Sequence, residues 1–438
     1  MSRKWNRRQF LAGSTAVAGV AADAQAQPPG RPIRVGFIGV GGRGTSLLRV
    51  TLTMPGIEVP AVCDINEANL SRAQSLVEQS GRPRPEGYSS GIEDFRRLVA
   101  RDDLDAVVNA GPWEWHTPMS VATMEAGKYA ATEVPAATTL EECWSLVRAS
   151  EASGKPCMIL ENVCYFRNAL MVLNLVQQGV LGDLAHCEGG YQHDVRVAFF
   201  GRKERGEVPG EVSWRGMHAV RTNGNIYPTH PIGPIAWWLD INRGDRFTYL
   251  TSMSSRSRGI NHFVTKRFGK EHRNASRRYA LGDVNTSMIM TEKGRTVTLY
   301  HDTSLPRPYD LILRVQGTNG IYSGTLDKLY VEGRSPEHEK WEDPERYYAQ
   351  YEHAIWKALG ERARGRGHGG ADYLTLHQFY EAVRQNRQTP IDVYDTAAWS
   401  AIMPLSAQSV AARSAPIDFP DFTQGRWKRA RPIEFLGI

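Results

Sequence analysis

A glycine-rich turn early in the chain has the residue types and spacing of a dinucleotide-binding site. Gly39, Gly41 and Gly44 form a G-x-G-x-x-G pattern that follows a short apolar strand expected at 34–39 and opens a helix. Such glycines let the backbone turn tightly and approach a pyrophosphate, which the N–H groups of the helix N-terminus bind. Asp64 follows 20 residues after Gly44, where a carboxylate can accept hydrogen bonds from the adenosine ribose hydroxyls. Since a carboxylate repels a 2′-phosphate, the pattern favours NAD over NADP.

Apolar strands alternate with helices around this turn. Further strands are expected at 57–64, 104–110, 128–132 and 156–160, with helices at 117–126 and 140–153. This alternation predicts an α/β fold with a doubly wound parallel sheet, a Rossmann domain, at 32–160.

The pattern changes after residue 160. Strands expected at 186–191, 247–252, 287–291, 296–300 and 311–316 are separated by long irregular stretches, with helices at 168–178, 373–387 and 396–412. These elements predict an α+β substrate-binding domain at 161–438 with a largely antiparallel sheet. The face of such a sheet often supports dimers, so a homo-oligomer is one expectation, although the sequence specifies no oligomeric state.

The first 26 residues resemble a twin-arginine export signal. Arg7 and Arg8 lie in an Asn-Arg-Arg-Gln-Phe-Leu motif, an apolar stretch continues to Ala22, and Ala24-Gln25-Ala26 makes a small-x-small cleavage site. The apolar stretch is too short to span a bilayer. We therefore expect a periplasmic or secreted protein that is exported already folded. The alternative is a disordered cytoplasmic tail.

Composition and spacing count against several other classes of protein. The formal net charge is +6, about half of it within the expected signal, and the remainder forms no Lys or Arg run, so neither nucleic acid nor membrane is an expected partner. The five cysteines include no C-x-x-C pair and are expected to be small buried hydrophobes. The sequence contains no H-E-x-x-H, no Cys/His ligand spacing and no G-x-S-x-G, which disfavours a metal site and a serine hydrolase.

Longer motifs carry a resemblance to a known family. The glycine turn, Glu133-Val134-Pro135 and the second domain resemble the Gfo/Idh/MocA oxidoreductases over most of 32–410. Further motifs narrow the match to the NAD-dependent α-N-acetylgalactosaminidases of glycoside hydrolase family 109. They are Trp113-Glu-Trp-His116, Glu161-Asn-Val-Cys-Tyr165, Gly190-Tyr-Gln-His-Asp194, Tyr227-Pro-Thr-His230, His301-Asp-Thr-Ser-Leu305, Arg307-Pro-Tyr309 and Gly367-His-Gly-Gly370. Related sugar dehydrogenases usually carry a lysine at position 134, whereas the valine is expected in family 109.

The resemblance implies two sets of site residues. With the glycines above, the cofactor set is Gly39, Gly41, Gly42, Arg43, Gly44, Asp64, Trp113, Glu114, Trp115, His116, Glu133, Val134 and Asn162. The sugar set is Tyr191, Arg215, Tyr227, Pro228, Thr229, His230 and Tyr309. For Arg43, contact with the phosphates and simple solvation are both open. The irregular stretch at 197–213 leaves the substrate selectivity open.

The implied chemistry differs from the two-carboxylate route by which a glycosidic bond is ordinarily cleaved. Oxidation of sugar C3 by bound NAD⁺ makes the C2 proton removable, and loss of that proton expels the aglycone from C1. Water then adds, and C3 is reduced again. The result is hydrolysis without net redox change, so the cofactor never has to dissociate.

Three residues are candidates for the acid–base work. His230 is the expected base at O3, because imidazole titrates near neutral pH; a structural histidine is the alternative. Tyr191 is the candidate at C2, against ordinary aromatic packing, and Arg215 would stabilise an enolate there. Tyr309 would bind the sugar or assist the leaving group. Glu161 either orients these groups or forms an ion pair in the domain hinge.

We therefore expect a glycosidase that removes terminal α-linked N-acetylgalactosamine from a glycan or glycoconjugate by means of tightly bound NAD. Two alternatives remain at this stage. One is an NAD-dependent sugar dehydrogenase of the Gfo/Idh/MocA type, and the other is a catalytically silent sugar-binding protein that keeps NAD as part of its fold.

Overall fold

The first sheet is the doubly wound parallel sheet that the sequence predicts. The computed structural model describes residues 30–203 and 207–438, so the expected export signal lies outside the described residues. Six strands pair in the order β3-β2-β1-β4-β5-β6, every neighbouring pair parallel. The strands are β1 (Ile33–Ile38), β2 (Ile57–Cys63), β3 (Glu86–Tyr88), β4 (Ala106–Asn109), β5 (Tyr129–Thr132) and β6 (Cys157–Ile159). The helices between them are α1 (Gly42–Leu52), α2 (Glu67–Gln79), α3 (Phe95–Val99), α4 (Trp113–Glu125) and α5 (Leu140–Ser153).

The second sheet is mixed and mostly antiparallel, again as predicted. Its eight strands pair in the order β13-β12-β11-β7-β10-β9-β8-β14, and β7 with β10 is the parallel pair. The strands are β7 (Leu184–Gln192), β8 (Phe247–Ser254), β9 (Asn285–Thr291), β10 (Thr296–Asp302), β11 (Arg314–Gly317), β12 (Gly320–Ser323), β13 (Lys328–Val331) and β14 (Ile417–Asp418). Buried and exposed residues alternate along β9, because one face packs on helices and the other faces solvent.

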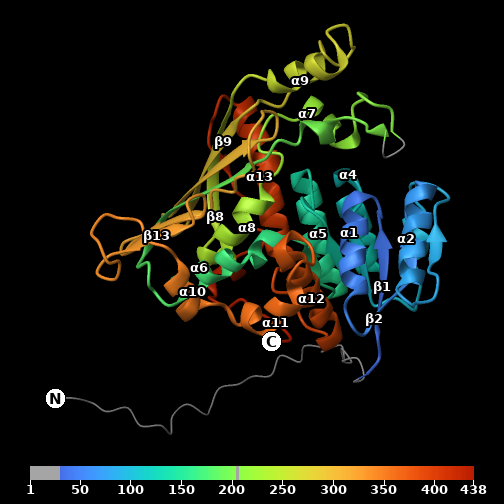
Figure 1. Ribbon diagram of the computed structural model, residues 1–438, viewed down its shortest axis with the longest axis horizontal. Helices are drawn as coiled ribbons and strands as arrows, with labels where there is room; N and C mark the ends of the chain where they lie inside the picture. The colour runs from blue at the N-terminus through green and yellow to red at the C-terminus, as the bar shows by residue number, and fades with distance from the viewer. Residues whose placement is uncertain (1–29, 204–206) are drawn as a thin grey trace.

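Helices lie between the two sheets (Figure 1). They include α6 (Arg167–Gln177), α8 (Thr229–Trp238), α12 (Ala371–Gln385) and α13 (Val393–Ala411); α7 (Trp214–Arg221), α9 (Gly259–Phe268), α10 (Glu345–Tyr351) and α11 (Ala354–Ala363) lie further out. α13 contacts β8 of the second sheet as well as α5 and β6 of the first. The Thr396 hydroxyl joins α13 to β6, since it accepts from the Ile159 N–H at 3.1 Å and donates to the Cys157 carbonyl at 3.2 Å. Helices from the second predicted domain therefore complete the packing of the first.

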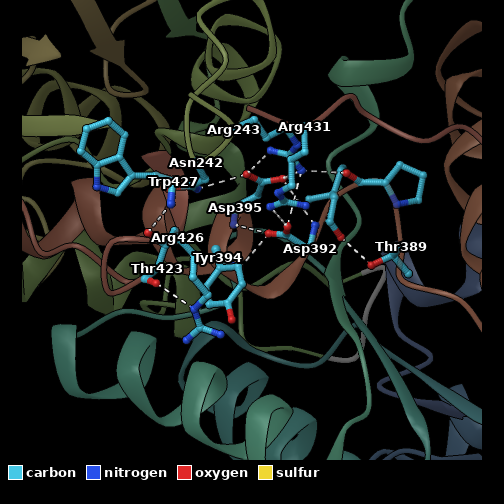
Figure 2. A network of polar contacts seen from close by, with 12 residues as sticks. Asn242, Arg243, Thr389, Asp392, Tyr394, Asp395, Thr423, Arg426, Trp427 and Arg431 are labelled. Atoms are coloured by element: carbon cyan, nitrogen blue, oxygen red, sulfur yellow. Dashed lines mark hydrogen bonds and ion pairs between the residues drawn. The ribbon is translucent and has the colours of Figure 1, made fainter. Parts of the chain in front are cut away.

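A buried ionic network anchors the start of α13 (Figure 2). The Arg243 guanidinium donates to both carboxylate oxygens of Asp395, at 2.7 and 2.5 Å, and Asn242 donates to the same carboxylate at 3.2 Å. Asp392 caps the helix and pairs with Arg431. The network joins the loop after α8, the N-terminus of α13 and the segment after β14 into one unit.

Two helices near the site begin where the sequence did not place them. The predicted helix at 117–126 is α4, which starts four residues earlier, at Trp113. Helix α8 was not predicted, because its segment contains Pro231 and Pro234. A proline in the first turn gives up no helical hydrogen bond, so the helix tolerates Pro231.

Two further observations concern the cysteines and the apolar character of the helices. All five cysteines are buried as free thiols, as predicted. Among residues 30–203 and 207–438, no helix combines the length and the apolar character that crossing a membrane requires.

Candidate active site at the carboxyl ends of the first sheet

The glycine turn between β1 and α1 has the shape needed to bind a dinucleotide. Gly39 has φ +76°, and a Cβ added to Gly44 would lie 1.9 Å from the Gly39 carbonyl oxygen, so both positions require glycine. Gly41 differs, because a Cβ there would meet only Asn69 Nδ2, at 3.7 Å. Gly41 is also the N-cap of α1, and no side chain among the described residues caps that helix. The open backbone over an uncapped helix N-terminus fits a pyrophosphate.

Asp64 lies at the end of β2 beside this turn. Its Oδ1 accepts from the Asn66 N–H at 2.8 Å, and both carboxylate oxygens lie 3.4 Å from Asn69 Nδ2. Burial raises the pKa of Asp64, while these hydrogen bonds counteract part of the rise. The carboxylate is thus held at the edge of the turn, where it can accept hydrogen bonds from ribose hydroxyls.

Arg43 forms an ionic cluster with residues from distant parts of the chain. Its Nε donates to Glu133 at 2.6 Å, and its Nη1 and Nη2 donate to Asp372 at 2.7 and 2.9 Å. Asp372 also accepts from Asn162 at 2.8 Å and lies 2.9 Å from His368 Nδ1. Arg43 is therefore ion-paired, which excludes simple solvation, one of its two predicted roles.

Asp372 accepts from or contacts three partners in this cluster, Arg43, Asn162 and His368. Burial alone would raise the pKa of its carboxyl, yet the hydrogen bonds and charges of His368 and Arg43 hold that pKa well below its usual range. The same interaction raises the pKa of His368. Asp372 belongs to α12, so a residue of the second predicted domain closes the cofactor side of the site.

The first turn of α4 contributes three aromatic side chains that lie in different directions. Trp113 is buried, with its ring 5.2 Å from Tyr227, whereas Trp115 packs against Phe95 on the opposite side. The His116 ring nitrogens lie 2.6 and 2.8 Å from the carbonyl oxygens of Pro135 and Gly111. His116 thus joins the loops after β4 and β5, and Trp113 joins the cofactor side to the sugar side.

The predicted sugar-binding residues converge beside the cluster. Tyr191, at the end of β7, stacks on Tyr227 with ring centroids 4.2 Å apart and an interplanar angle of 15°. His230, in the first turn of α8, lies 5.1 Å from Tyr191 and 5.2 Å from Tyr227. Tyr309 meets Tyr191 edge-on at 6.1 Å, and the Arg215 guanidinium lies 5.8 Å from the Tyr227 ring. The result is a cluster of aromatic side chains with one cation, a combination suited to a neutral sugar.

His230 is oriented by a buried carboxylate. Its Nδ1 lies 2.7 Å from Glu161 Oε1, which also accepts from the Val163 N–H at 3.1 Å. Glu161 is fully buried and follows β6, while His230 is about 15% exposed at its side chain. Because the carboxylate holds Nδ1, Nε2 is the nitrogen left to exchange a proton with a ligand. Of the two roles predicted for Glu161, the geometry supports orientation of the catalytic groups.

Tyr191 also has a histidine partner. Its hydroxyl lies 3.0 Å from His193 Nδ1. Burial, reinforced by the neighbouring Tyr227 and Tyr309, raises the pKa of Tyr191 well above its ordinary value. Burial and His230 lower the pKa of His193. Both shifts favour the neutral phenol and the neutral imidazole, so in the ligand-free protein the proton stays on Tyr191, and its hydroxyl is hydrogen-bonded to His193.

Three buried polar atoms of Glu161 and of the predicted sugar-binding residues have no hydrogen-bond partner in the described chain. They are Glu161 Oε2, Thr229 Oγ1 and Arg215 Nη1. Such atoms are rare in folded proteins and call for an explanation. Glu161 and Thr229 are wholly buried, whereas Arg215 is partly exposed, so of these three residues Arg215 is the one that a ligand can contact directly.

Sequence reasoning missed three residues of the site. Asp372 and His368 were not assigned to it, although Gly367-His-Gly-Gly370 had been noted as a motif. His193 lies in the Gly190-Tyr-Gln-His-Asp194 motif, of which only Tyr191 is predicted to belong to the site. The described residues contain no group of three or more His, Cys, Asp or Glu side chains arranged to hold a metal.

Family comparisons match the two halves of the chain separately. Residues 165–429 match the model described as glycosyl hydrolase 109, C-terminal domain. Residues 33–161 match that of the oxidoreductase family with an NAD-binding Rossmann fold.

Relatives with similar sequences match the chain over nearly its whole length. An alpha-N-acetylgalactosaminidase from Tannerella forsythia is 43% identical over 430 residues, covering 94% of this chain and 92% of that protein. A glycosyl hydrolase family 109 protein from Parabacteroides distasonis is 42% identical over 440 residues, covering 96% of this chain and 94% of that protein.

Solved structures share the fold at low sequence identity. Levoglucosan dehydrogenase in complex with NADH has a TM-score of 0.67 at 18% identity, over 89% of this chain and 100% of that one. The WlbA dehydrogenase from Bordetella pertussis, in complex with NADH and UDP-GlcNAcA, has a TM-score of 0.63 at 15% identity, over 90% of this chain and 99% of that one.

Proposed function

Because the chain belongs to glycoside hydrolase family 109 and carries an NAD-binding Rossmann domain, we propose that it hydrolyses terminal α-linked N-acetylgalactosamine while its NAD stays bound. The observation that carries this proposal is the His230–Glu161 pair, in which the His230 ring lies against the rings of Tyr191 and Tyr227. The name of the Tannerella forsythia relative supports the choice of sugar.

The residues that would hold NAD are the turn from Gly39 to Gly44, Asp64 and the first turn of α4. When bound there, NAD⁺ supplies a reversible hydride acceptor for C3 of the sugar. His230 takes the proton of the C3 hydroxyl at Nε2, and Glu161 stabilises the resulting imidazolium through Nδ1. His230 returns that proton when the hydroxyl is restored, so the protein ends the cycle unchanged.

The second proton transfer occurs at C2 of the sugar. A ketone at C3 makes this proton acidic, and Tyr191 removes it as His193 accepts the phenolic proton. Arg215 stabilises the negative charge that develops on the C3 oxygen. Loss of the C2 proton expels the aglycone from C1 as an oxyanion. Water then adds its hydroxyl at C1 and gives its other proton to the aglycone, and Tyr191 returns a proton to C2.

The test uses purified protein without added nicotinamide. The protein is incubated in D₂O with 4-nitrophenyl α-N-acetylgalactosaminide, and the released sugar is examined by NMR. We expect sustained release of nitrophenol and deuterium at C2. Formation of one equivalent of NADH without release of nitrophenol would indicate a dehydrogenase, and binding with neither NADH nor nitrophenol formed would indicate a silent sugar-binding protein.

We also propose that residues 1–26 direct export through the twin-arginine route, so that the enzyme works in the periplasm or outside the cell. Arg7-Arg8 and the Ala24-Gln25-Ala26 site support this assignment. A route for folded proteins suits an enzyme that must acquire NAD in the cytoplasm. Replacement of Arg7 and Arg8 by lysine should keep the full-length protein in the cytoplasmic fraction; unchanged export would contradict the assignment.

A homo-oligomer remains a prediction. The outer face of the second sheet exposes Tyr249, Met253 and Met288 on β8 and β9, which supports contact between copies. Analytical ultracentrifugation of the wild type and of Met253→Asp distinguishes a dimer through this face from a monomer.

A further inference from the structure

We propose that a cavity between α9 and the segment after β7 binds a sugar residue that carries a carboxylate, at a site separate from that of the reacting sugar. The cavity has a volume of about 290 Å³, which suits a single sugar residue. Its lining includes three aromatic and three cationic side chains, those of Phe200, Phe263, Phe268, Arg202, Lys203 and Arg267. Binding at this cavity does not require that the protein hydrolyse any glycoside.

Positive charge is concentrated in α9 and in the segments on either side of it. Residues 255–278 contain eight arginine and lysine residues and one glutamate, whereas the net charge of the whole chain is +6. Among residues 30–203 and 207–438, Lys270 and Arg273 each pair with a glutamate, but Arg267 pairs with no carboxylate. The Arg267 guanidinium is therefore available to a ligand, and the charge around it attracts anions.

Aromatic rings form the apolar part of the lining. Phe200 is buried and stacks on Phe263, with ring centroids 5.9 Å apart and an interplanar angle of 21°, while Phe268 meets Phe200 at 6.2 Å. The Arg267 guanidinium lies 5.9 Å from the centroids of both the Phe263 and the Phe268 rings. A sugar has an apolar face that packs on aromatic rings, and a guanidinium binds a carboxylate through two parallel hydrogen bonds. The lining thus suits a sugar with a carboxylate.

Hydrogen bonds fix the chain around the cavity. The Gly201 N–H donates to the Glu211 carbonyl at 2.7 Å, and the Asn274 side-chain amide donates to the Gly210 carbonyl at 2.7 Å. These bonds join the segment after β7 to the residues that follow α9. Because the shape of the cavity is fixed before a ligand binds, little conformational entropy is lost on binding.

The cavity lies on the same side of the molecule as the predicted sugar-binding residues. The 3-10 helix η2 (Arg196–Phe199), which contributes to the lining, contacts α7, the helix that carries Arg215. Helix α9 lies beyond α7 in the view of Figure 1. No residue of the lining belongs to the predicted sugar set, so the two sites are distinct. A glycan bound at the cavity would be held close to the reacting site, which raises its effective concentration there.

The burial of the aromatic rings favours an acidic glycan over other anionic partners. Phe263 and Phe268 are only half exposed, so their rings cannot insert into a bilayer as those of an interfacial helix do. Binding of a nucleic acid strand usually requires aromatic rings on which successive bases stack along a groove. Here the rings pack on one another around a space for one residue.

Arg267→Glu and Lys266→Glu make a matched pair of variants. Both residues are exposed in the last turn of α9 and each substitution changes the charge equally, but only Arg267 lines the cavity. Binding of methyl glucuronide is measured by ligand-observed NMR at about 0.15 M salt, where the charges of more distant residues are screened. Arg267→Glu should weaken binding by at least about tenfold, and Lys266→Glu by less than about threefold.

Three further probes define the ligand. Methyl glucoside, which lacks the carboxylate, and acetate, which lacks the sugar, should each bind at least about tenfold more weakly than methyl glucuronide. Saturating N-acetylgalactosamine should leave binding of the glucuronide unchanged. Equal losses in the two variants, or equal binding of acetate and the glucuronide, would show diffuse attraction of anions and overturn the proposal. Displacement by N-acetylgalactosamine would overturn it too, because the glucuronide would then occupy the reacting site.

The outcome is separable from that of the proposed function. Both variants should hydrolyse 4-nitrophenyl α-N-acetylgalactosaminide at the wild-type rate, since neither residue belongs to the predicted sugar set. Failure of the wild type to hydrolyse this substrate would overturn the proposed function, while binding of methyl glucuronide that depends on Arg267 would still support the second site. Failure of the wild type to bind methyl glucuronide would overturn the second site, whether or not single-stranded DNA or phosphatidylglycerol vesicles bind.

Discussion

The cofactor side and the sugar side of the site satisfy their polar groups in opposite ways. On the cofactor side, Arg43, Glu133 and Asp372 form mutual ion pairs that also draw in Asn162 and His368. On the sugar side, aromatic rings form the wall, and several buried polar atoms have no partner in the described chain. Ion pairs within the chain fix one conformation of that side. Buried donors and acceptors without a partner in the chain can instead be satisfied by a ligand that binds and dissociates. The difference fits a cofactor that stays and a sugar that exchanges.

The largest expected effect on activity comes from a substitution on the sugar side that should leave NAD binding unchanged. His230→Ala removes the proposed acid–base group on the sugar side and should lower kcat by about 10²–10⁴. Bound NAD, measured after denaturation, should remain at the wild-type level, since among the described residues no hydrogen bond or ion pair joins His230 to Arg43, Glu133 or Asp372. His262→Ala is the control, because His262 is an exposed residue of α9. Loss of NAD along with activity would show that the two sides are not independent.

The cofactor side is tested by Asp372→Asn. The amide keeps the size of the side chain but removes the charge that pairs with Arg43. Charged hydrogen bonds of this kind contribute about 1.5–3 kcal/mol, so NAD release should become about 10–100-fold faster. Stopped-flow fluorescence measures the release, and saturating NAD should restore kcat.

The control for Asp372→Asn is His368→Gln. His368 contacts the same carboxylate, but its side chain is 55% exposed, so the effect should stay within about fivefold. An unchanged release rate in Asp372→Asn would contradict the role of the ion cluster in retention.

As the pH falls, the interactions on the sugar side should lose stability at a higher pH than the ion pairs on the cofactor side. His301 lies opposite Tyr191 in the pairing of β10 with β7, and burial lowers its pKa from 6.5 to about 3. As the pH falls, His301 is therefore protonated in the unfolded chain at a higher pH than in the folded chain. Since protonation then favours the unfolded chain, the free energy of unfolding falls as the pH drops from 6.5 toward 3. Between pH 7 and pH 5 this contribution amounts to about 2 kcal/mol. The pKa of Asp372 lies below its usual range, so its ion pairs persist in that interval.

Urea unfolding of the wild type and of His301→Gln at pH 7 and pH 5 measures this contribution. The variant should lose about 2 kcal/mol less than the wild type over the same interval. Comparing the changes with pH, rather than the stabilities at one pH, removes any constant cost of the substitution. Equal losses in the two proteins would show that His301 does not titrate as its burial requires.

Local patterns were sufficient to predict much of the fold. The spacing of Gly39, Gly41 and Gly44 and the apolar strand before them depend only on nearby residues, and the structure shows the turn that they predict. Helix α8 was missed because its prolines are unfavourable by local propensity, while burial of Trp237 and Trp238 stabilises the helix. The start of α4 at Trp113 was missed for a related reason, since Trp and His are weak helix formers.

Long-range contacts account for what the sequence could not specify at the site. Asp372 reaches Arg43 because α12 returns to α1, a contact that no pattern in either segment encodes. The pairing of His230 with Glu161 likewise depends on α8 lying against the turn after β6. Resemblance named Arg43, Glu133 and His230, and Glu161 was one candidate to orient the catalytic groups. Asp372 became clear as a partner of Arg43 only when the second domain was placed on the first.

The placement of α13 limits how natural or designed relatives can exchange parts. A chimaera joined at residue 160 would bring a foreign β6 to the Thr396 hydroxyl, which bonds Ile159 and Cys157 in this chain. It would also change the loop that Ser400 holds through the Ala136 N–H, at 3.2 Å. Recombination between relatives should therefore yield folded products when residues 393–411 are inherited together with the first sheet, although hundreds of codons separate them.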